Sequence, residues 1–219
     1  MLASRDGGLR KQVIVARPGV GKLPGKGLDA SNYNSRPHGL TLPQVLDRYR
    51  PASELWAGAT HGTYGARELQ AAFVRTGIAP QNALLGQTLD LGSGAVLRVL
   101  AVGTRGATLL IEWDRFRLLL PLGINLDDLE ALGHGDSIGK VNALLLADSG
   151  YAPSNPPEWI TNLQPQVVLI SVSAADQEGL PSPETLELLR GYTVLRTDRN
   201  GWIELSTDGE QMWVEVERR

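Results

Sequence analysis

The chain has 219 residues, of which 42% are hydrophobic, and a formal net charge of −3. That length suffices to bury a full core, so we predict a single domain over residues 1–219, with an irregular basic part over residues 1–41. Cysteine is absent, which excludes disulfides, thiolate zinc sites and cysteine nucleophiles, and neither a signal-peptide core nor an apolar run long enough to span a bilayer is present.

The first part of the chain is basic. Residues 1–50 contain nine lysines and arginines against three acidic residues, a net charge of +6, whereas the rest has a net charge of −9. This segment is either a solvated loop region or a contact for phosphates or acidic lipid. The candidate nucleic-acid contacts in it are Arg10, Lys11, Arg17, Lys22, Lys26 and Arg36.

Apolar patterns predict the elements of the first half. They indicate strands over residues 11–17 and 54–57, and helices over residues 42–50 and 66–76, the second closed by Gly77. The middle of the chain is rich in strands, which we expect over residues 95–102, 107–113 and 116–122. The last two flank Asp114 and Arg115 and are typical of a hairpin.

The second half alternates helices with strands. The predicted helices cover residues 126–132, 156–163 and 183–190, the last capped by Ser182. The predicted strands cover residues 141–147, 166–173, 193–196, 201–205 and 211–216. This order favours an α/β (α+β) protein in which two sheets pack together with helices outside.

Three apparent motifs carry little weight. Residues 135–139 fit the G-x-S-x-G pattern, but they follow a helix and precede a strand, so we interpret them as a loop. The glycines and lysines of residues 19–27 lack the spacing of a phosphate loop. His61 and His134 lie between glycines and are expected to face solvent.

Four segments together resemble the metallo-β-lactamase-like domain at the end of ComEC-type competence proteins, the membrane channels for DNA uptake. They are FRLLLPLGINL, NALLLADSGYAPSNPPEWI, SVSAADQEGLPSPETLELL and VLRTDRNGWIELSTDG, and the resemblance covers residues 8–217. It implies a four-layer αββα sandwich. It also suggests that the chain is a fragment of a larger membrane protein, located at the extracytoplasmic face.

In that family, histidines and a bridging carboxylate hold two metal ions at fixed stations. The positions of this chain that match those stations are Tyr33, Ser35, Pro37, His38, Gly123, Asp148, Ser149 and Leu180. Because generating hydroxide near neutral pH needs several imidazoles and a shared carboxylate, the resemblance implies an inactive site with no metal and no cofactor. The remaining candidates for a weakly held cation are His38, Asp148 and Asp198, although the two carboxylates are more typical of hydrogen bonds to turn amides.

Three functions remain open. The first is a non-catalytic module with a structural or DNA-contacting role, whose partners are DNA and the rest of a membrane channel. The second is a metal-dependent nuclease or phosphoesterase with a non-standard site. The third is a module that binds a small molecule or a partner in the emptied cleft. The oligomeric state is left open.

Overall fold

The computed structural model describes residues 11–16, 54–56, 64–77, 79–123 and 126–218. The helix predicted over residues 42–50 lies outside these ranges, as do the station positions Tyr33, Ser35, Pro37 and His38. The strands are β1 Lys11–Ala16, β2 Glu54–Trp56, β3 Pro80–Asn82, β4 Thr88–Asp90, β5 Val96–Val102, β6 Ala107–Trp113, β7 Phe116–Leu122, β8 Ala143–Leu145, β9 Val167–Ile170, β10 Thr193–Arg196, β11 Ile203–Thr207 and β12 Met212–Val216. The helices are α2 Tyr64–Thr76, α3 Leu126–Ala131, α4 Pro157–Leu163, α5 Pro183–Leu188 and α6 Thr197–Asn200, with short 3-10 turns η2 Gly133–Gly135, η3 Ala147–Gly150 and η4 Ala152–Ser154.

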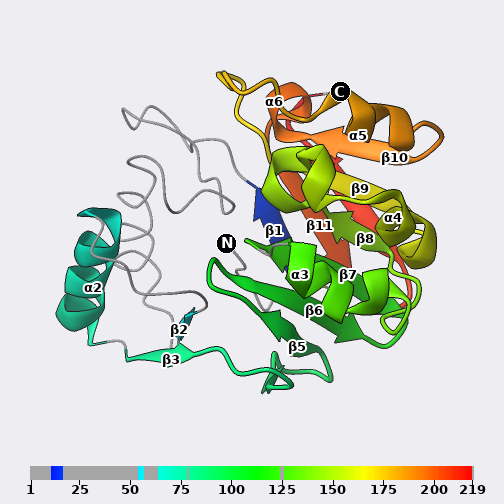
Figure 1. The fold of residues 1–219 in the computed structure, drawn as a ribbon. Coiled ribbons are helices and arrows are strands. Elements are labelled where there is room, and N and C mark those ends of the chain that lie inside the picture. The colour runs from blue at the N-terminus through cyan, green and yellow to red at the C-terminus, as the bar shows by residue number, and fades with distance from the viewer. Residues whose placement is uncertain (1–10, 17–53, 57–63, 78, 124–125, 219) are drawn as a thin grey trace.

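A seven-stranded mixed sheet organises the described chain (Figure 1). Its order is β10-β9-β8-β7-β6-β5-β4, with parallel pairing from β10 to β7 and antiparallel pairing from β7 to β4. The hairpin predicted around Asp114 is confirmed, and that residue takes a positive φ of 49° in the turn. Strands β6, β7 and β10 have the predicted bounds.

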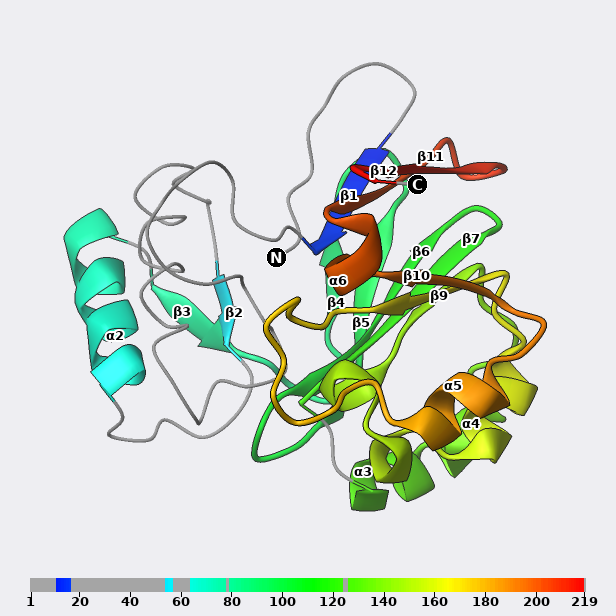
Figure 2. The same ribbon diagram turned by 90° about the horizontal axis from the view of Figure 1, so that it is seen from above.

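Two smaller sheets complete the strand pairing. One is antiparallel, in the order β1-β11-β12, and the other is the parallel pair β2-β3. Figure 2 shows the three-stranded sheet over one face of the seven-stranded sheet and α3, α4 and α5 over the other. Helix α2 and the β2-β3 pair lie to one side.

The large sheet is apolar on both faces. Along β7, Leu118 and Leu120 point toward the three-stranded sheet and pack with Ile203 and Leu205 of β11, whereas Leu119 points toward the helices. On the helix face, fully buried Trp159 belongs to the same cluster as Leu119. Continuous apolar runs such as that of β7 are therefore explained by burial on both sides. The described residues form three layers, and a fourth stays a prediction.

Some local expectations were wrong in extent. The strand expected over residues 141–147 is only β8, because the chain turns into η3 directly after it. Strands β3 and β4 were not predicted, since neither has an apolar alternation. Ser182 does precede α5, but its side chain makes no capping bond. Within the described ranges, no helix is both long and apolar enough to cross a bilayer.

Candidate functional site

The candidate site is the edge of the seven-stranded sheet where β7, β8, β9 and β10 end. Because these strands are parallel, the segments that follow them meet at one edge, where ligands commonly bind in open α/β sheets. We call this the carboxyl edge and define it as Gly123 and residues 146–151, 171–181 and 197–198. The tip of the β5–β6 hairpin, residues 103–106, also reaches it, because Ala107 pairs with Leu122 at the end of β7.

Asp148 makes the main polar contacts of the loop after β8. Its Oδ1 accepts a hydrogen bond from Arg105 Nη2 at 3.2 Å, and its Oδ2 accepts one from Ser154 Oγ at 2.9 Å. Its side chain is 16% exposed, against 42% for that of Arg105. The resemblance singled out Asp148, whereas Arg105 was missed because nothing in the local sequence links residues so far apart.

The backbone of this loop has an unusual shape. Asp148 and Ser149 both take left-handed conformations, with φ of 43° and 54°. Asn155, which is 2% exposed, holds the loop: its Oδ1 accepts from Ala147 N, and its Nδ2 donates to the carbonyls of Ala147 and Tyr151. A buried amide that satisfies three backbone groups stabilises a turn that would otherwise be strained.

The loops after β8 and β9 are in close contact. A Cβ added to Gly150 would lie 2.6 Å from Cβ of Pro181, so this approach requires a glycine. Ser182 N donates to Gly150 O at 3.1 Å, and Ser182 Oγ accepts from Ala152 N at 3.1 Å. The hydroxyl expected to cap α5 therefore bonds to η4 instead.

Gly123 and Leu180, two further station residues within the described ranges, serve the backbone and the core. Gly123 has a φ of 64°, and a Cβ there would lie 2.6 Å from the carbonyl oxygen of Arg105. Leu180 packs on the helix-face core, and its N–H donates to Asp176 Oδ2 at 2.8 Å. Ser149 is 4% exposed. Glycine and leucine side chains supply no metal ligand.

Asp198 is held by an arginine of its own. Its two carboxylate oxygens accept from Nε and Nη2 of Arg196 at 3.0 and 2.6 Å, and the side chains of Asp198 and Arg196 are 18% and 11% exposed. Next to it, Thr197 Oγ1 donates to Val172 O and accepts from Val172 N. These two hydrogen bonds connect the start of α6 to the segment after β9.

The carboxyl edge therefore brings Asp148 and Asp198 to one side of the sheet but pairs each with a different arginine. Nowhere in the described ranges do three or more histidine, aspartate or glutamate residues form a group that could hold a metal. His134 lies in η2, away from this edge, and His38 and His61 are outside the described residues. The donor set that the structure describes does not fit a di-metal centre.

The weaker motifs are placed as loops. Residues 136–139 follow η2 as a turn, and Ser137 is exposed, with its Oγ donating to Leu132 O at 3.4 Å, which is no setting for a nucleophile. The glycine- and lysine-containing stretch of residues 19–27 lies outside the described ranges. Of the six basic candidates, only Lys11 lies within them; it begins β1 and pairs with Thr207 of β11.

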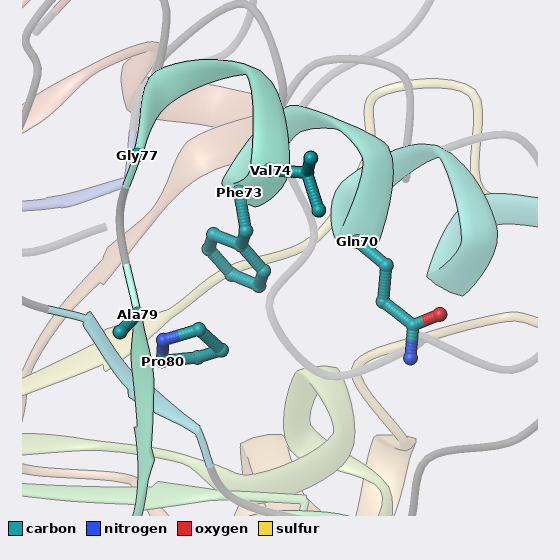
Figure 3. A pocket seen from close by; sticks show the side chains of 6 residues that line it. All are labelled: Gln70, Phe73, Val74, Gly77, Ala79 and Pro80. Atoms are coloured by element: carbon teal, nitrogen blue, oxygen red, sulfur yellow. The ribbon is translucent and has the colours of Figure 1, made fainter.

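A shallow hollow of about 320 Å³ lies apart from this edge, between α2 and β3 (Figure 3). Its lining residues are Gln70, Phe73, Val74, Gly77, Ala79 and Pro80. None of these side chains titrates or binds metal, so the hollow offers apolar contact and no acid–base chemistry. It is not the emptied cleft that the resemblance suggested as a binding site.

No protein-family model and no curated protein sequence matches the chain. Among solved structures, it is similar to the crystal structure of a protein from Thermotoga maritima described as a Zn-dependent hydrolase of the metallo-β-lactamase superfamily. The identity is 12%, the TM-score is 0.38, and the match covers 54% of this chain and 72% of the other. At this level of similarity the likeness is weak and assigns no activity to this chain.

Proposed function

We propose that this chain is a non-hydrolytic domain with a metallo-β-lactamase-like sandwich, and that it is a structural or DNA-contacting part of a ComEC-type DNA-uptake membrane protein. The observation that carries the non-hydrolytic part is the pairing at the carboxyl edge. Asp148 and Asp198, the carboxylates that the sequence singled out there, are each bonded to an arginine.

Charge and ligand number at the carboxyl edge both disfavour a hydrolytic metal centre. A hydrolytic centre needs cations that are held by several imidazoles or carboxylates and that keep an open position for water. Here a guanidinium already neutralises each carboxylate, and a divalent ion would have to displace it. Gly123 and Leu180 add no ligand atoms from their side chains. The domain would thus keep the sheet and its loops without the chemistry.

The DNA-contacting part of the proposal rests on charge. The net charge of +6 on residues 1–50 contrasts with −9 on the rest, and a cluster of cations on one segment is the usual electrostatic feature of a phosphate-binding surface. The ComEC-type context rests on the four sequence segments and on nothing in the geometry.

Metal content and nuclease activity test the non-hydrolytic part. The protein is purified with zinc or manganese supplied, its metal is counted, and it is incubated with DNA. We expect substoichiometric metal and no turnover. Stoichiometric metal, with turnover that Asp148→Ala abolishes and Glu215→Ala preserves, would replace this proposal with a metal-dependent nuclease. Glu215 is a suitable control because it is exposed and lies in β12.

DNA binding is tested separately. Affinity for single- and double-stranded DNA is measured over a salt series, for the intact chain and for the Lys22→Glu/Lys26→Glu variant. We expect binding that weakens steeply with salt and weakens further in the variant, because phosphate contacts release counterions. Arg218→Glu, which changes an exposed cation outside the basic segment, should have a smaller effect. Absence of binding at low salt would leave only a scaffold role.

A further inference from the structure

We propose that Arg105 and Asp148 form a salt-sensitive latch, which holds the tip of the β5–β6 hairpin closed against the carboxyl ends of β7 and β8. Ser154 supports the latch by donating a hydrogen bond to the carboxylate of Asp148. Arg105 and Asp148 are 43 residues apart in the chain, so their contact joins two separate segments rather than stabilising one turn. The latch goes beyond the proposed function, because it concerns motion of the tip whether or not DNA or metal binds.

The hairpin tip lies directly on its neighbours. A Cβ on Gly106 would collide with the carbonyl of Leu122, and one on Gly103 would collide with the carboxylate of Asp128 in α3. The tip closes on itself through a hydrogen bond from Gly103 N to Gly106 O at 2.9 Å. Residues 103–106 therefore touch the end of β7 and α3 through backbone, and the loop after β8 through the Arg105 side chain.

The two halves of the latch differ in how firmly they are held. Asp148 is largely buried, and its Oδ2 is fixed by Ser154, so the carboxylate has little freedom to follow a moving partner. Arg105 is 42% exposed and makes one hydrogen bond to Asp148, at 3.2 Å. A half-exposed ion pair with a single bond is weak and is screened by salt. The arginine side is therefore the one that releases.

The other ion pair at this edge provides the contrast. Arg196 holds Asp198 with two bonds, and both side chains are less than one-fifth exposed, at 11% and 18%. Bidentate geometry and burial protect that pair from salt. We thus assign Arg196 and Asp198 as a permanent brace and Arg105 and Asp148 as the contact that opens. Opening would uncover the ends of β7 and β8 and free the guanidinium donors of Arg105.

Hydrogen exchange of the intact chain, followed by mass spectrometry at low and high salt, tests the latch. We expect exchange of residues 103–106 and 147–151 to rise with salt in the native protein. In Arg105→Met it should already be up to about fivefold faster at low salt, because a weak exposed pair is lost, and it should no longer respond to salt. Arg115→Met is the control: it removes an exposed ion pair between Arg115 and Glu210, whose side chains are 80% and 60% exposed, respectively. It should change the exchange rate of neither segment.

Two results would overturn the latch. One is native exchange in these segments that is independent of salt and unchanged in Arg105→Met. The other is a uniform rise across β8 and β9 in Arg105→Met, which would mean global destabilisation and not local opening. Ser154→Ala is a milder variant that should give an intermediate effect if the first variant folds poorly. Metal content is measured independently, so failure of the latch and failure of the proposed function are distinguishable.

Discussion

The two faces of the seven-stranded sheet and its carboxyl edge are stabilised in different ways. The faces bury mainly aliphatic side chains, with Phe116 on the side of the three-stranded sheet and Trp159 on the helix side, and they depend on packing spread over many residues. The edge depends on a few individual contacts, such as the Gly150–Pro181 approach and the two arginine–carboxylate pairs. A fold of this kind keeps its architecture when residues at the edge change, as long as the glycines and the pairs remain compatible. Unfolding free energies of variants in the two regions should distinguish distributed packing from dependence on individual contacts.

The largest effect should come from the helix face. Trp159 is 0% exposed, and Trp159→Ala should cost about 3–5 kcal/mol of unfolding free energy, because it leaves a cavity under the sheet. Urea unfolding measures this loss. Trp159→Phe is the matched control: among the described residues Trp159 Nε1 has no hydrogen-bond partner, so phenylalanine removes an unpaired donor and should cost much less. Equal losses in the two variants would contradict the packing argument.

The permanent brace of Arg196 and Asp198 should have the second-largest effect on stability. Asp198→Ala leaves Arg196 unpaired in a site where its side chain is only 11% exposed, and it should cost about 3 kcal/mol. Thermal or urea unfolding gives the value. Glu187→Ala removes an ion pair with Arg190 whose side chains are 61% and 78% exposed, and it should cost about 0.5 kcal/mol or less. If the two variants were equally stable, the edge would not depend on individual contacts.

The close contact between Gly150 and Pro181 should have the third-largest effect on stability. Gly150→Ala places a Cβ 2.6 Å from that of Pro181 and keeps a φ of 82°, and it should cost about 2 kcal/mol. Gly191→Ala has a φ of 90°, but no atom of the described part of the chain lies within 4 Å of the new Cβ, so it should cost about 1 kcal/mol for the backbone alone. The difference in unfolding free energy reports the contact between the loops, and no difference would mean that the loops move apart freely.

The latch should have the smallest global effect. Arg105→Met should lower the unfolding free energy by about 1 kcal/mol or less, because the pair is half-exposed. The matching test is a double-mutant cycle with Asp148→Asn in urea. A coupling energy near zero would show that the two side chains do not interact in solution. If Arg105→Met lost more unfolding free energy than Asp198→Ala, the Arg105–Asp148 pair would be the stronger of the two, contrary to this ranking.

The sequence predicted the interior of the fold better than its edge. The apolar runs on both sides of Asp114 and Arg115 predicted the hairpin, and β10 has its predicted bounds, because burial of a strand leaves an apolar run in the sequence. Strands β3 and β4 were missed because their residues are mostly exposed. Local sequence rules correctly predicted that Ser182 precedes α5, but they did not predict that its hydroxyl accepts a hydrogen bond from Ala152 N.

Within the candidate site, the residues identified by resemblance were placed at turns, while their partners were not predicted. Gly123 and Gly150 could be expected at tight turns from their type alone. The contact between Arg105 and Asp148 joins segments that meet only after the sheet has formed, and no local pattern records it. Asn155 was missed for the same reason, since its role depends on the shape of the loop after β8.

Metal content, measured on the protein purified with zinc or manganese supplied, decides whether the carboxyl edge is a metal centre. Because the carboxylates of Asp148 and Asp198 are each paired with an arginine, we expect far less than one metal ion per chain, unchanged in Asp148→Ala. One or two tightly held ions per chain, lost in Asp148→Ala, would contradict it.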